Sequence, residues 1–278
     1  MADGPTWVSL VEGCGLPRQE ARWLAEEAAG GSWAAIADDR TNALMHHRFT
    51  TMAARRLEGE PLQYVLGHWS FRTLDLLVDR RVLIPRPETE WVVEAAIEAI
   101  APDRSDLVVV DLGTGSGAIA LSLAVELWPR AARVVATDAS PAALAVAGAN
   151  LAGIGRPGTR VSLHAGSWFA AVPAEMRGAV DLLVSNPPYV APSDALPPEV
   201  ADWEPASALV PGPTGLEAVE EILREAPAWL APGAAVVVEI GETQGAAVAA
   251  LATAAGLVDV RVGVDPAGKD RWVVGRRE

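Results

Sequence analysis

The amino-acid sequence predicts a doubly wound α/β fold with a mostly parallel sheet of seven strands, preceded by a small helical domain and a β-hairpin. Three observations lead to this prediction. After about residue 107, short apolar runs typical of buried strands alternate with longer stretches whose apolar residues recur at helical spacing. Half of the 278 residues are hydrophobic, chiefly Ala, Val and Leu, which suits parallel strands covered by helices. A glycine-rich turn separates the first of these strands from the first helix.

Residues 1–60 are predicted to form a helical bundle, with helices over residues 17–29 and 40–57. The glycines at 30 and 31 break the pattern between them. We expect Trp7, Trp23 and Trp33 to form the core of this domain.

Residues 61–86 are predicted to be a β-hairpin connector, because stretches at 68–71 and 74–79 alternate around a short turn. Pro87 then suits the first turn of a helix, and Glu88 and Glu90 fall in that turn, where the helix dipole favours carboxylates. These structural roles leave Arg86 unexplained.

Residues 87–278 are predicted to form the α/β domain. Strands are expected at 107–112, 133–137, 160–163, 181–185, 234–240, 258–262 and 272–274. Helices are expected at 118–127, 141–151, 214–229 and 245–255, the third beginning with Thr214 and Glu217 spaced as a capping box.

Composition excludes several classes of function. The net charge of −14 disfavours direct DNA binding, which needs clustered cations. The single cysteine, Cys14, permits neither an internal disulfide nor a thiolate metal cluster, and the adjacent His46 and His47 lack the spacing of a metal pair, so no metal site is expected. No secretory signal and no apolar run of about 20 residues is evident, so we expect no membrane association and a cytoplasmic location.

The glycine-rich turn points to a bound cofactor. Asp138 ends the second expected strand, where an acid can accept both hydrogen bonds of a ribose diol. Trp168 follows the third strand and could cover an adenine ring. The spacing G-x-G-x-G fits S-adenosylmethionine better than a dinucleotide. The turn consists of Gly113, Thr114, Gly115, Ser116 and Gly117.

An unusual tetrapeptide, Asn186, Pro187, Pro188 and Tyr189, follows the fourth strand. Strand ends of a parallel sheet meet at one edge, so this segment is expected beside the glycine turn. The Asn186 side-chain oxygen and the Pro187 carbonyl can each accept an N–H bond from a planar nitrogen, and Tyr189 can pack against the planar group. The pattern therefore predicts methylation of an amide or exocyclic amine, with no side-chain base needed before transfer.

These motifs resemble the glutamine methyltransferases that modify peptide chain release factors. The resemblance implies a Rossmann-like methyltransferase sheet and methyl transfer from S-adenosylmethionine to the glutamine of a Gly-Gly-Gln loop. It implies that the glycine turn and Asp138 hold the cofactor, that Trp168 lies along its adenine, and that the tetrapeptide binds the glutamine. We also expect Asn186 to contact the cofactor and Arg86 to contact the substrate. Relatives commonly place an acid at the position of Ser167. The matching segments are residues 59–64 with Gly67, 84–90, 111–117, 168–169, 186–189, 204–205 with 208–209, and 270–271.

Two other classes of function remain open at this point. The first is an amino-methyltransferase that acts on DNA adenine or cytosine or on a ribosomal-protein glutamine, since such enzymes use the same tetrapeptide. The second is a non-catalytic module that binds S-adenosylmethionine. The acidic charge, and the lack of a separate target-recognition region after Tyr189, argue against DNA. We expect the helical domain to recognise the substrate protein and the enzyme to be a monomer.

Overall fold

The computed structural model describes residues 4–101, 104–128, 130 and 133–278. The chain divides into two compact units, the first comprising Met1–His68 with Leu196–Trp203 and the second Trp69–Ala195 with Glu204–Glu278. Each unit has a hydrophobic core of its own.

The first unit is helical. Asn42 caps the longest helix by accepting from the N–H of Met45, and Trp7 packs edge to face on Phe49 at the centre of the core (5.9 Å between ring centroids). Trp33 packs against this core, whereas the expected core residue Trp23 is 38% exposed. The helices are α1 Trp7–Gly13, α2 Arg18–Ala29, α3 Trp33–Ile36, α4 Ala43–Leu57, α5 Leu62–Leu66 and α9 Pro198–Ala201.

A two-stranded hairpin, β1 (His68–Phe71) and β2 (Leu74–Leu77), follows the first unit along the chain. Arg72 makes the turn with φ of 50°. Its guanidinium binds Glu126 twice at 2.5 Å and Glu94 at 2.8 Å. The hairpin turn is thereby fixed to two helices of the second unit, α6 (Pro87–Glu98) and α7 (Ala118–Glu126).

The second unit contains the predicted seven-stranded sheet, with the strand order β5-β4-β3-β6-β7-β9-β8. Neighbours from β5 to β7 are parallel, and β9 pairs antiparallel with β7 and β8. The chain runs outward from β3 to β5, then returns to place β6 on the other side of β3, so a topological switch point lies between β3 and β6. The strands are β3 Val108–Leu112, β4 Arg133–Asp138, β5 Val161–Ala165, β6 Val180–Ser185, β7 Leu230–Glu239, β8 Val258–Val264 and β9 Asp270–Arg276.

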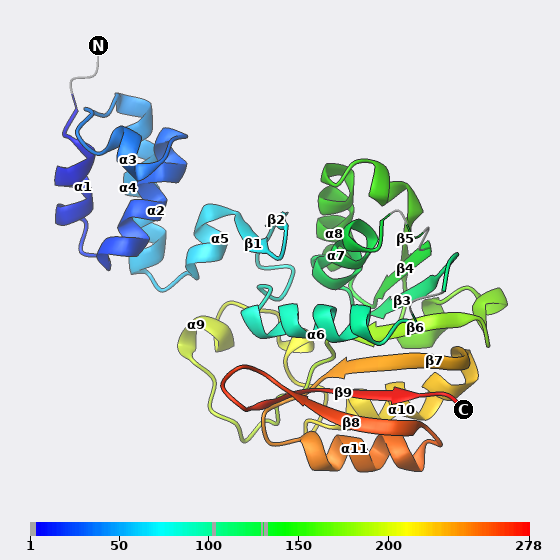
Figure 1. The fold of residues 1–278 in the computed structure, drawn as a ribbon. Coiled ribbons are helices and arrows are strands. Elements are labelled where there is room, and N and C mark those ends of the chain that lie inside the picture. Colours follow the sequence, from blue (N-terminus) through cyan, green and yellow to red (C-terminus); the bar gives the residue numbers. More distant parts are fainter. Residues whose placement is uncertain (1–3, 102–103, 129, 131–132) are drawn as a thin grey trace. The chain divides into compact units, whose positions relative to one another are not determined.

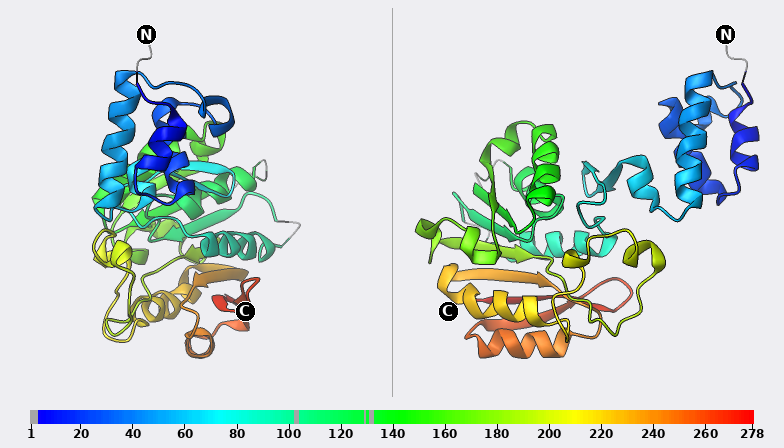
Figure 2. Two further views of the ribbon diagram at one scale, coloured as in Figure 1. Left: turned by 90° about the vertical axis from the view of Figure 1, so that its left-hand side faces the viewer. Right: turned by 180° about the vertical axis from the view of Figure 1, so that it is seen from behind.

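Helices cover both faces of the sheet (Figure 1). Successive strand residues point to opposite faces, so Val109 packs with α6 and α7 while Val110 packs with α10 and α11. Figure 2 shows α10 and α11 running together on one face. The remaining helices of this unit are α8 Pro141–Gly153, α10 Glu217–Trp229, α11 Gly245–Ala254 and the short 3₁₀ turns η1 Arg156–Arg160, η2 Trp168–Ala171, η3 Ala174–Met176 and η4 Ala206–Ala208.

Two predicted helix starts are wrong by three residues, since the helix expected from residue 40 begins at Ala43 after its cap Asn42. Helix α10 begins at Glu217 rather than Thr214. The Glu217 carboxylate does accept from the Thr214 N–H at 2.8 Å, but the Thr214 hydroxyl accepts from the N–H of Leu216 and holds a turn ahead of the helix. In the part of the chain that the structure describes, no helix is both long and apolar enough to cross a membrane.

Candidate functional site

The glycine turn follows β3 directly. The backbone N–H groups of Gly113 and Thr114 both donate to the carbonyl of Thr137, at 2.9 and 2.8 Å. Gly117 caps α7 with φ of 87°, and a Cβ there would lie 3.0 Å from Leu121. The positive φ therefore favours glycine at that position, and the Leu121 side chain would have to shift to make room for a Cβ.

Asp111 lies beneath this turn and is fully buried. Its Oδ2 accepts from the Thr114 hydroxyl at 2.6 Å and from the N–H of Ala120 at 3.2 Å, which fixes the turn to α7. Its Oδ1 is buried with no hydrogen-bond partner among the described residues. Burial, as the largest cause, raises the pKa of Asp111 to about 7.

Asp138 ends β4 and orders the backbone around it. Its Oδ2 accepts from the N–H of Gly115 at 2.9 Å and its Oδ1 from the N–H of Ser140 at 2.8 Å. Each carboxylate oxygen retains a second lone pair, so Asp138 can still accept hydrogen bonds from a ligand.

A cavity of about 230 Å³ opens at this edge of the sheet. Residues after β3, β4, β5 and β6 line it, together with residues 81–83 and 85 of the connector and residues 205, 207 and 208. Gly117, Pro187, Tyr189 and Arg86 are not among the lining residues. Of the predicted site residues, the structure brings together around this cavity Gly113, Thr114, Gly115, Ser116, Asp138, Trp168, Asn186 and Pro188.

Trp168 lies against the glycine turn. A Cβ at Gly113 would stand 3.3 Å from the Trp168 ring, so the turn leaves room for the indole. Trp168 has φ of 42°, a conformation that bulky residues rarely adopt and that is kept where surrounding structure imposes it. Ser167 precedes it and also lines the cavity.

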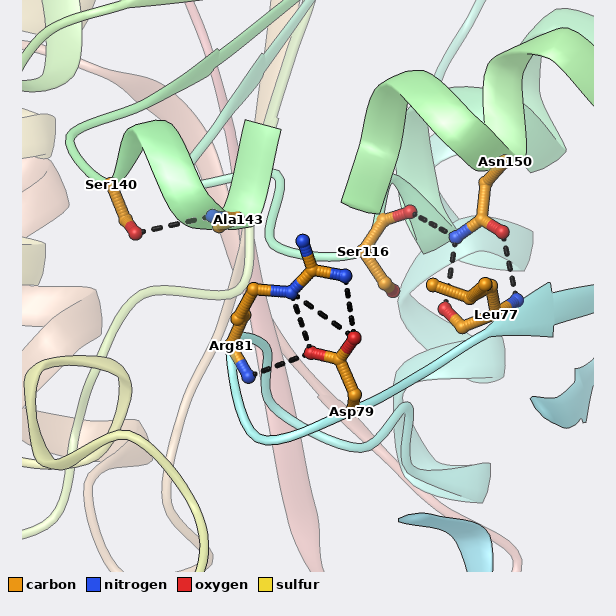
Figure 3. Close-up of polar contacts among 7 residues, drawn as sticks. All are labelled: Leu77, Asp79, Arg81, Ser116, Ser140, Ala143 and Asn150. Carbon is orange, nitrogen blue, oxygen red and sulfur yellow. Dashed lines mark hydrogen bonds and ion pairs between the residues drawn. The ribbon is translucent and has the colours of Figure 1, made fainter. Parts of the chain in front are cut away.

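The connector is fixed to the glycine turn by Asn150 of α8, as Figure 3 shows. The Asn150 side chain accepts from the Leu77 N–H at 2.7 Å and donates to the carbonyls of Leu77 and Ser116 at 3.1 and 2.9 Å. Beyond this point, Arg81 lines the cavity while its guanidinium binds Asp79.

The tetrapeptide leaves β6 where the Ser185 hydroxyl donates to the Leu112 carbonyl at 2.6 Å, which joins the ends of β6 and β3. The Asn186 Nδ2 donates to the hydroxyl of Thr89 at 3.2 Å. The Tyr189 hydroxyl donates to Oε1 of Glu239 at 3.3 Å. Asn186 therefore lines the cavity, whereas Tyr189 does not and is held by Glu239.

Thr89 and Glu239 are functional candidates that the sequence reasoning missed. Both are buried, Thr89 in the first turn of α6 and Glu239 at the end of β7. Burial raises the pKa of Glu239 to about 7, while the Thr89 and Tyr189 hydroxyls act to lower it. A single carboxylate that ends an otherwise apolar strand, Val-Val-Val-Glu, was a signal for Glu239.

Arg86 is paired inside the protein. Its Nη2 binds Oε1 of the buried Glu204, whose Oε2 accepts from the Ile84 N–H at 3.2 Å. This pair ties the start of α6 to the segment after residue 203, and the predicted contact of Arg86 with substrate stays a prediction. The described residues contain no cluster of His, Cys, Asp and Glu that could hold a metal ion.

Family models and solved structures agree with this architecture. The model described as "Methyltransferase small domain" matches residues 95–201, and "PrmC N-terminal domain" matches residues 9–67. A methyltransferase from Pyrococcus furiosus aligns with a TM-score of 0.53 at 18% identity, over 82% of this chain and 98% of that one. A 16S rRNA methyltransferase of T. thermophilus, solved with AdoMet and guanosine, aligns with a TM-score of 0.53 at 17% identity, over 76% of this chain and 50% of that one. These two likenesses show the fold.

Sequence relatives identify the family. The release factor glutamine methyltransferase of Cereibacter sphaeroides is 47% identical over 82% of this chain and 79% of its own. The enzyme of the same name from Bordetella pertussis is 45% identical over 94% of this chain and 96% of its own. At this identity, across most of both chains, the protein belongs to the release factor glutamine methyltransferase family.

Proposed function

We propose that this protein transfers a methyl group from S-adenosylmethionine to the side-chain amide nitrogen of the glutamine in the Gly-Gly-Gln loop of peptide chain release factors. The observation that carries the proposal is that Asn186 lines the same cavity as the glycine turn and Asp138. Family membership supports the choice of a protein glutamine over a nucleic-acid base.

The residues around the cavity fit S-adenosylmethionine. Asp138 supplies free lone pairs for a ribose diol, and its contact with the Gly115 N–H places those lone pairs beside the glycine turn. Trp168 offers a flat apolar surface next to Gly113, as an adenine needs. We assign cofactor binding to Gly113, Thr114, Gly115, Ser116 and Gly117 with Asp138, Trp168 and Asn186.

The bound cofactor supplies an electrophilic methyl group on a sulfonium. The protein must then orient an amide nitrogen, which is a weak nucleophile because its lone pair is delocalised. Asn186 Oδ1 and the Pro187 carbonyl accept its two N–H groups, and Pro188 and Tyr189 confine the planar amide. The side chains of Asn186 and Tyr189 are held before substrate arrives, since Asn186 is hydrogen-bonded to Thr89 and Tyr189 to Glu239. The nitrogen loses its proton after transfer, when it has become far more acidic.

The decisive experiment measures transfer of a labelled methyl group to three acceptors: an intact release factor, a large-subunit ribosomal protein, and duplex DNA. We expect label in the release factor, and none in a release factor whose Gly-Gly-Gln glutamine is replaced. Label in DNA or the ribosomal protein, with none in the release factor, overturns the proposal. Cofactor binding without transfer to any acceptor supports a non-catalytic module instead.

We further propose that the N-terminal helical domain recognises the release factor outside its loop, and that residues 61–86 act as a connector to the methyltransferase domain of residues 87–278. Leu44 and Leu57, at the two ends of α4, are 68% and 58% exposed and offer apolar contacts on this unit. The double substitution L44S/L57S should raise KM for the intact factor and leave KM for a short Gly-Gly-Gln peptide unchanged. Val264→Ser on the exposed strand β8 is the matched control, and an equal rise in both KM values contradicts this role.

The remaining expectations follow from the substrate. Release factors act on ribosomes, so we propose that the enzyme works in the cytoplasm, and that it does so as a monomer that binds neither DNA nor membranes. Light scattering of the purified protein tests the monomeric state, and a stable dimer overturns it.

A further inference from the structure

A buried hydrogen-bonded group lies behind the tetrapeptide and connects three segments that are distant in sequence. In the β6 and β7 register Ser185 lies opposite Val238, so Asn186 and Glu239 leave the sheet as neighbours. Thr89 reaches the same place from the first turn of α6. The Glu239 carboxylate therefore stands between the Tyr189 hydroxyl on one side and the Thr89 hydroxyl on the other.

The direction of these hydrogen bonds follows from the groups themselves. An ionised carboxylate can only accept, so both Tyr189 and Thr89 can donate their hydroxyl protons to Glu239. The Thr89 oxygen is then free to accept, and it accepts from Nδ2 of Asn186 at 3.2 Å. That contact turns Oδ1 of Asn186 away from Thr89, which leaves it available to an N–H donor. Oε2 of Glu239 is buried and has no hydrogen-bond partner in the described residues, so it can accept the proton of the Thr89 hydroxyl, which lies close enough to lower the pKa of Glu239.

We propose that Glu239 is a positioning residue for the methyl acceptor: its buried carboxylate holds Tyr189 directly and, through the Thr89 hydroxyl, fixes the side-chain amide of Asn186 with Oδ1 toward the substrate. This inference rests on the proposed function and deepens it. Nothing in the arrangement requires Glu239 to touch the glutamine, and its effect passes through Asn186 and Tyr189.

Protonation of Glu239 reverses the direction of the hydrogen bonds that run from Asn186 through the Thr89 hydroxyl to Glu239. A protonated carboxyl donates one hydrogen bond, and when Thr89 receives it the Thr89 proton turns toward Asn186, which favours the flipped amide. Glu239 faces Glu88 and Thr89 from α6, Tyr189 from the tetrapeptide and Arg271 from β9. Burial and Glu88 favour the protonated form, whereas Thr89, Tyr189 and Arg271 favour the ionised form. With a pKa raised to about 7, Glu239 changes state near neutral pH.

The test compares wild type with E239Q, T89V and T89S in methylation of an intact release factor between pH 6 and pH 8.5. The amide introduced by E239Q has the shape of the protonated acid and, like it, carries one donor group and one acceptor oxygen. This variant should therefore lower kcat about tenfold or more at pH 8, with cofactor Kd unchanged. The ratio of wild-type to E239Q kcat should shrink toward pH 6, where wild type becomes protonated. T89V should lose as much as E239Q, whereas T89S, which keeps the hydroxyl, should stay within about threefold of wild type.

The outcomes separate this proposal from the proposed function. A wild-type enzyme that does not methylate the release factor removes the proposed function itself. If wild type is active but the ratio of its kcat to that of E239Q is the same at every pH, the positioning role is overturned. A T89V variant with wild-type kcat overturns it as well. Thermal melting of all four proteins accompanies the kinetics. A loss of kcat that follows melting temperature, with no recovery in T89S, shows a merely structural role and also overturns the proposal.

Discussion

The side-chain amide of Gln244 donates to the backbone carbonyl of Tyr189 at 3.0 Å. Its Oε1 accepts from the Gly241 N–H at 2.9 Å, and Nε2 also reaches the carbonyl of Gly215 at 3.3 Å. Gln244 therefore joins the end of the tetrapeptide to the loops before α10 and after β7. A Cβ at Gly215 would lie 2.6 Å from the Tyr189 carbonyl, which shows how closely these segments approach.

We expect Gln244→Ala to loosen Tyr189 and lower kcat about tenfold, at a cost of about 1 kcal/mol in the free energy of unfolding. Gln244→Glu keeps the acceptor for Gly241 but loses the donor to Tyr189, so it should lower kcat as much as the alanine does. Kinetics with an intact release factor and denaturant unfolding measure both effects. Thr243→Ala, at the exposed neighbouring position, is the control and should behave as wild type. Wild-type kcat in Gln244→Glu would show that the donated bond does not matter.

The Asn150 contacts lead to a second prediction. Asn150→Ala removes the partners of the part-buried Leu77 N–H and the buried Ser116 carbonyl, which should lower the free energy of unfolding by about 2 to 3 kcal/mol. Asn150→Asp preserves the bond to the Leu77 N–H but turns a carboxylate oxygen toward two carbonyls. It should therefore be more destabilising at pH 8 than at pH 5. Urea unfolding at both pH values measures this, and equal stability at the two pH values contradicts it.

Much of the fold could be predicted from the sequence, because the spacing of apolar residues and the glycines and prolines that end helices and strands are local signals. The order of the seven sheet strands and of helices α7, α8, α10 and α11 among them, the hairpin, and Pro87 at the start of α6 were predicted correctly. The start of α10 was not, since Thr214 can serve as a helix cap or a turn residue and only its hydrogen bond to Leu216 decides. Trp23 was misplaced because helical spacing does not show which face of α2 meets the core.

The candidate site was partly predictable for a different reason. Residues that end parallel strands meet at one edge, so Asp138 and Asn186 could be placed together without a structure. Thr89, Glu239 and Gln244 could not, because their roles depend on contacts between segments at least 50 residues apart, namely Tyr189 with Glu239 (50 residues), Tyr189 with Gln244 (55 residues) and Asn186 with Thr89 (97 residues). No local pattern records such pairings.

A third prediction concerns cofactor binding by Asp138. Asp138→Ala removes an acceptor for a ribose diol and frees the N–H groups of Gly115 and Ser140, so it should weaken S-adenosylhomocysteine binding about 50-fold or more. Calorimetry with the product and with its 2′-deoxy analogue separates the two effects. Wild type should prefer the diol about tenfold or more, and Asp138→Ala should have lost that preference. If the variant keeps the preference, Asp138 acts only on the glycine turn.

The last prediction concerns stability and pH. Burial raises the pKa of Asp111 from its ordinary 3.8 to about 7, so between these values the folded protein keeps a proton that the unfolded chain releases. The contribution of Asp111 to the free energy of unfolding should therefore be highest below about pH 4 and fall as the pH rises toward 7. Midway between these pH values its slope should approach about 1.4 kcal/mol per pH unit. Glu239, with its pKa likewise raised to about 7, adds a second contribution of the same sign.

Asp111→Asn should remove its share of this slope, because the amide keeps an acceptor for Thr114 and Ala120 but carries no titrating proton. Asp111→Asn combined with E239Q should flatten the window further, since the two groups lie on different strands and act separately. Denaturant unfolding of the cofactor-free protein at half-unit steps from pH 4.5 to 7.5 measures the slopes. A double variant with the full wild-type slope would mean that both carboxylates are ionised in the folded protein throughout the range, and that other groups set its response to pH.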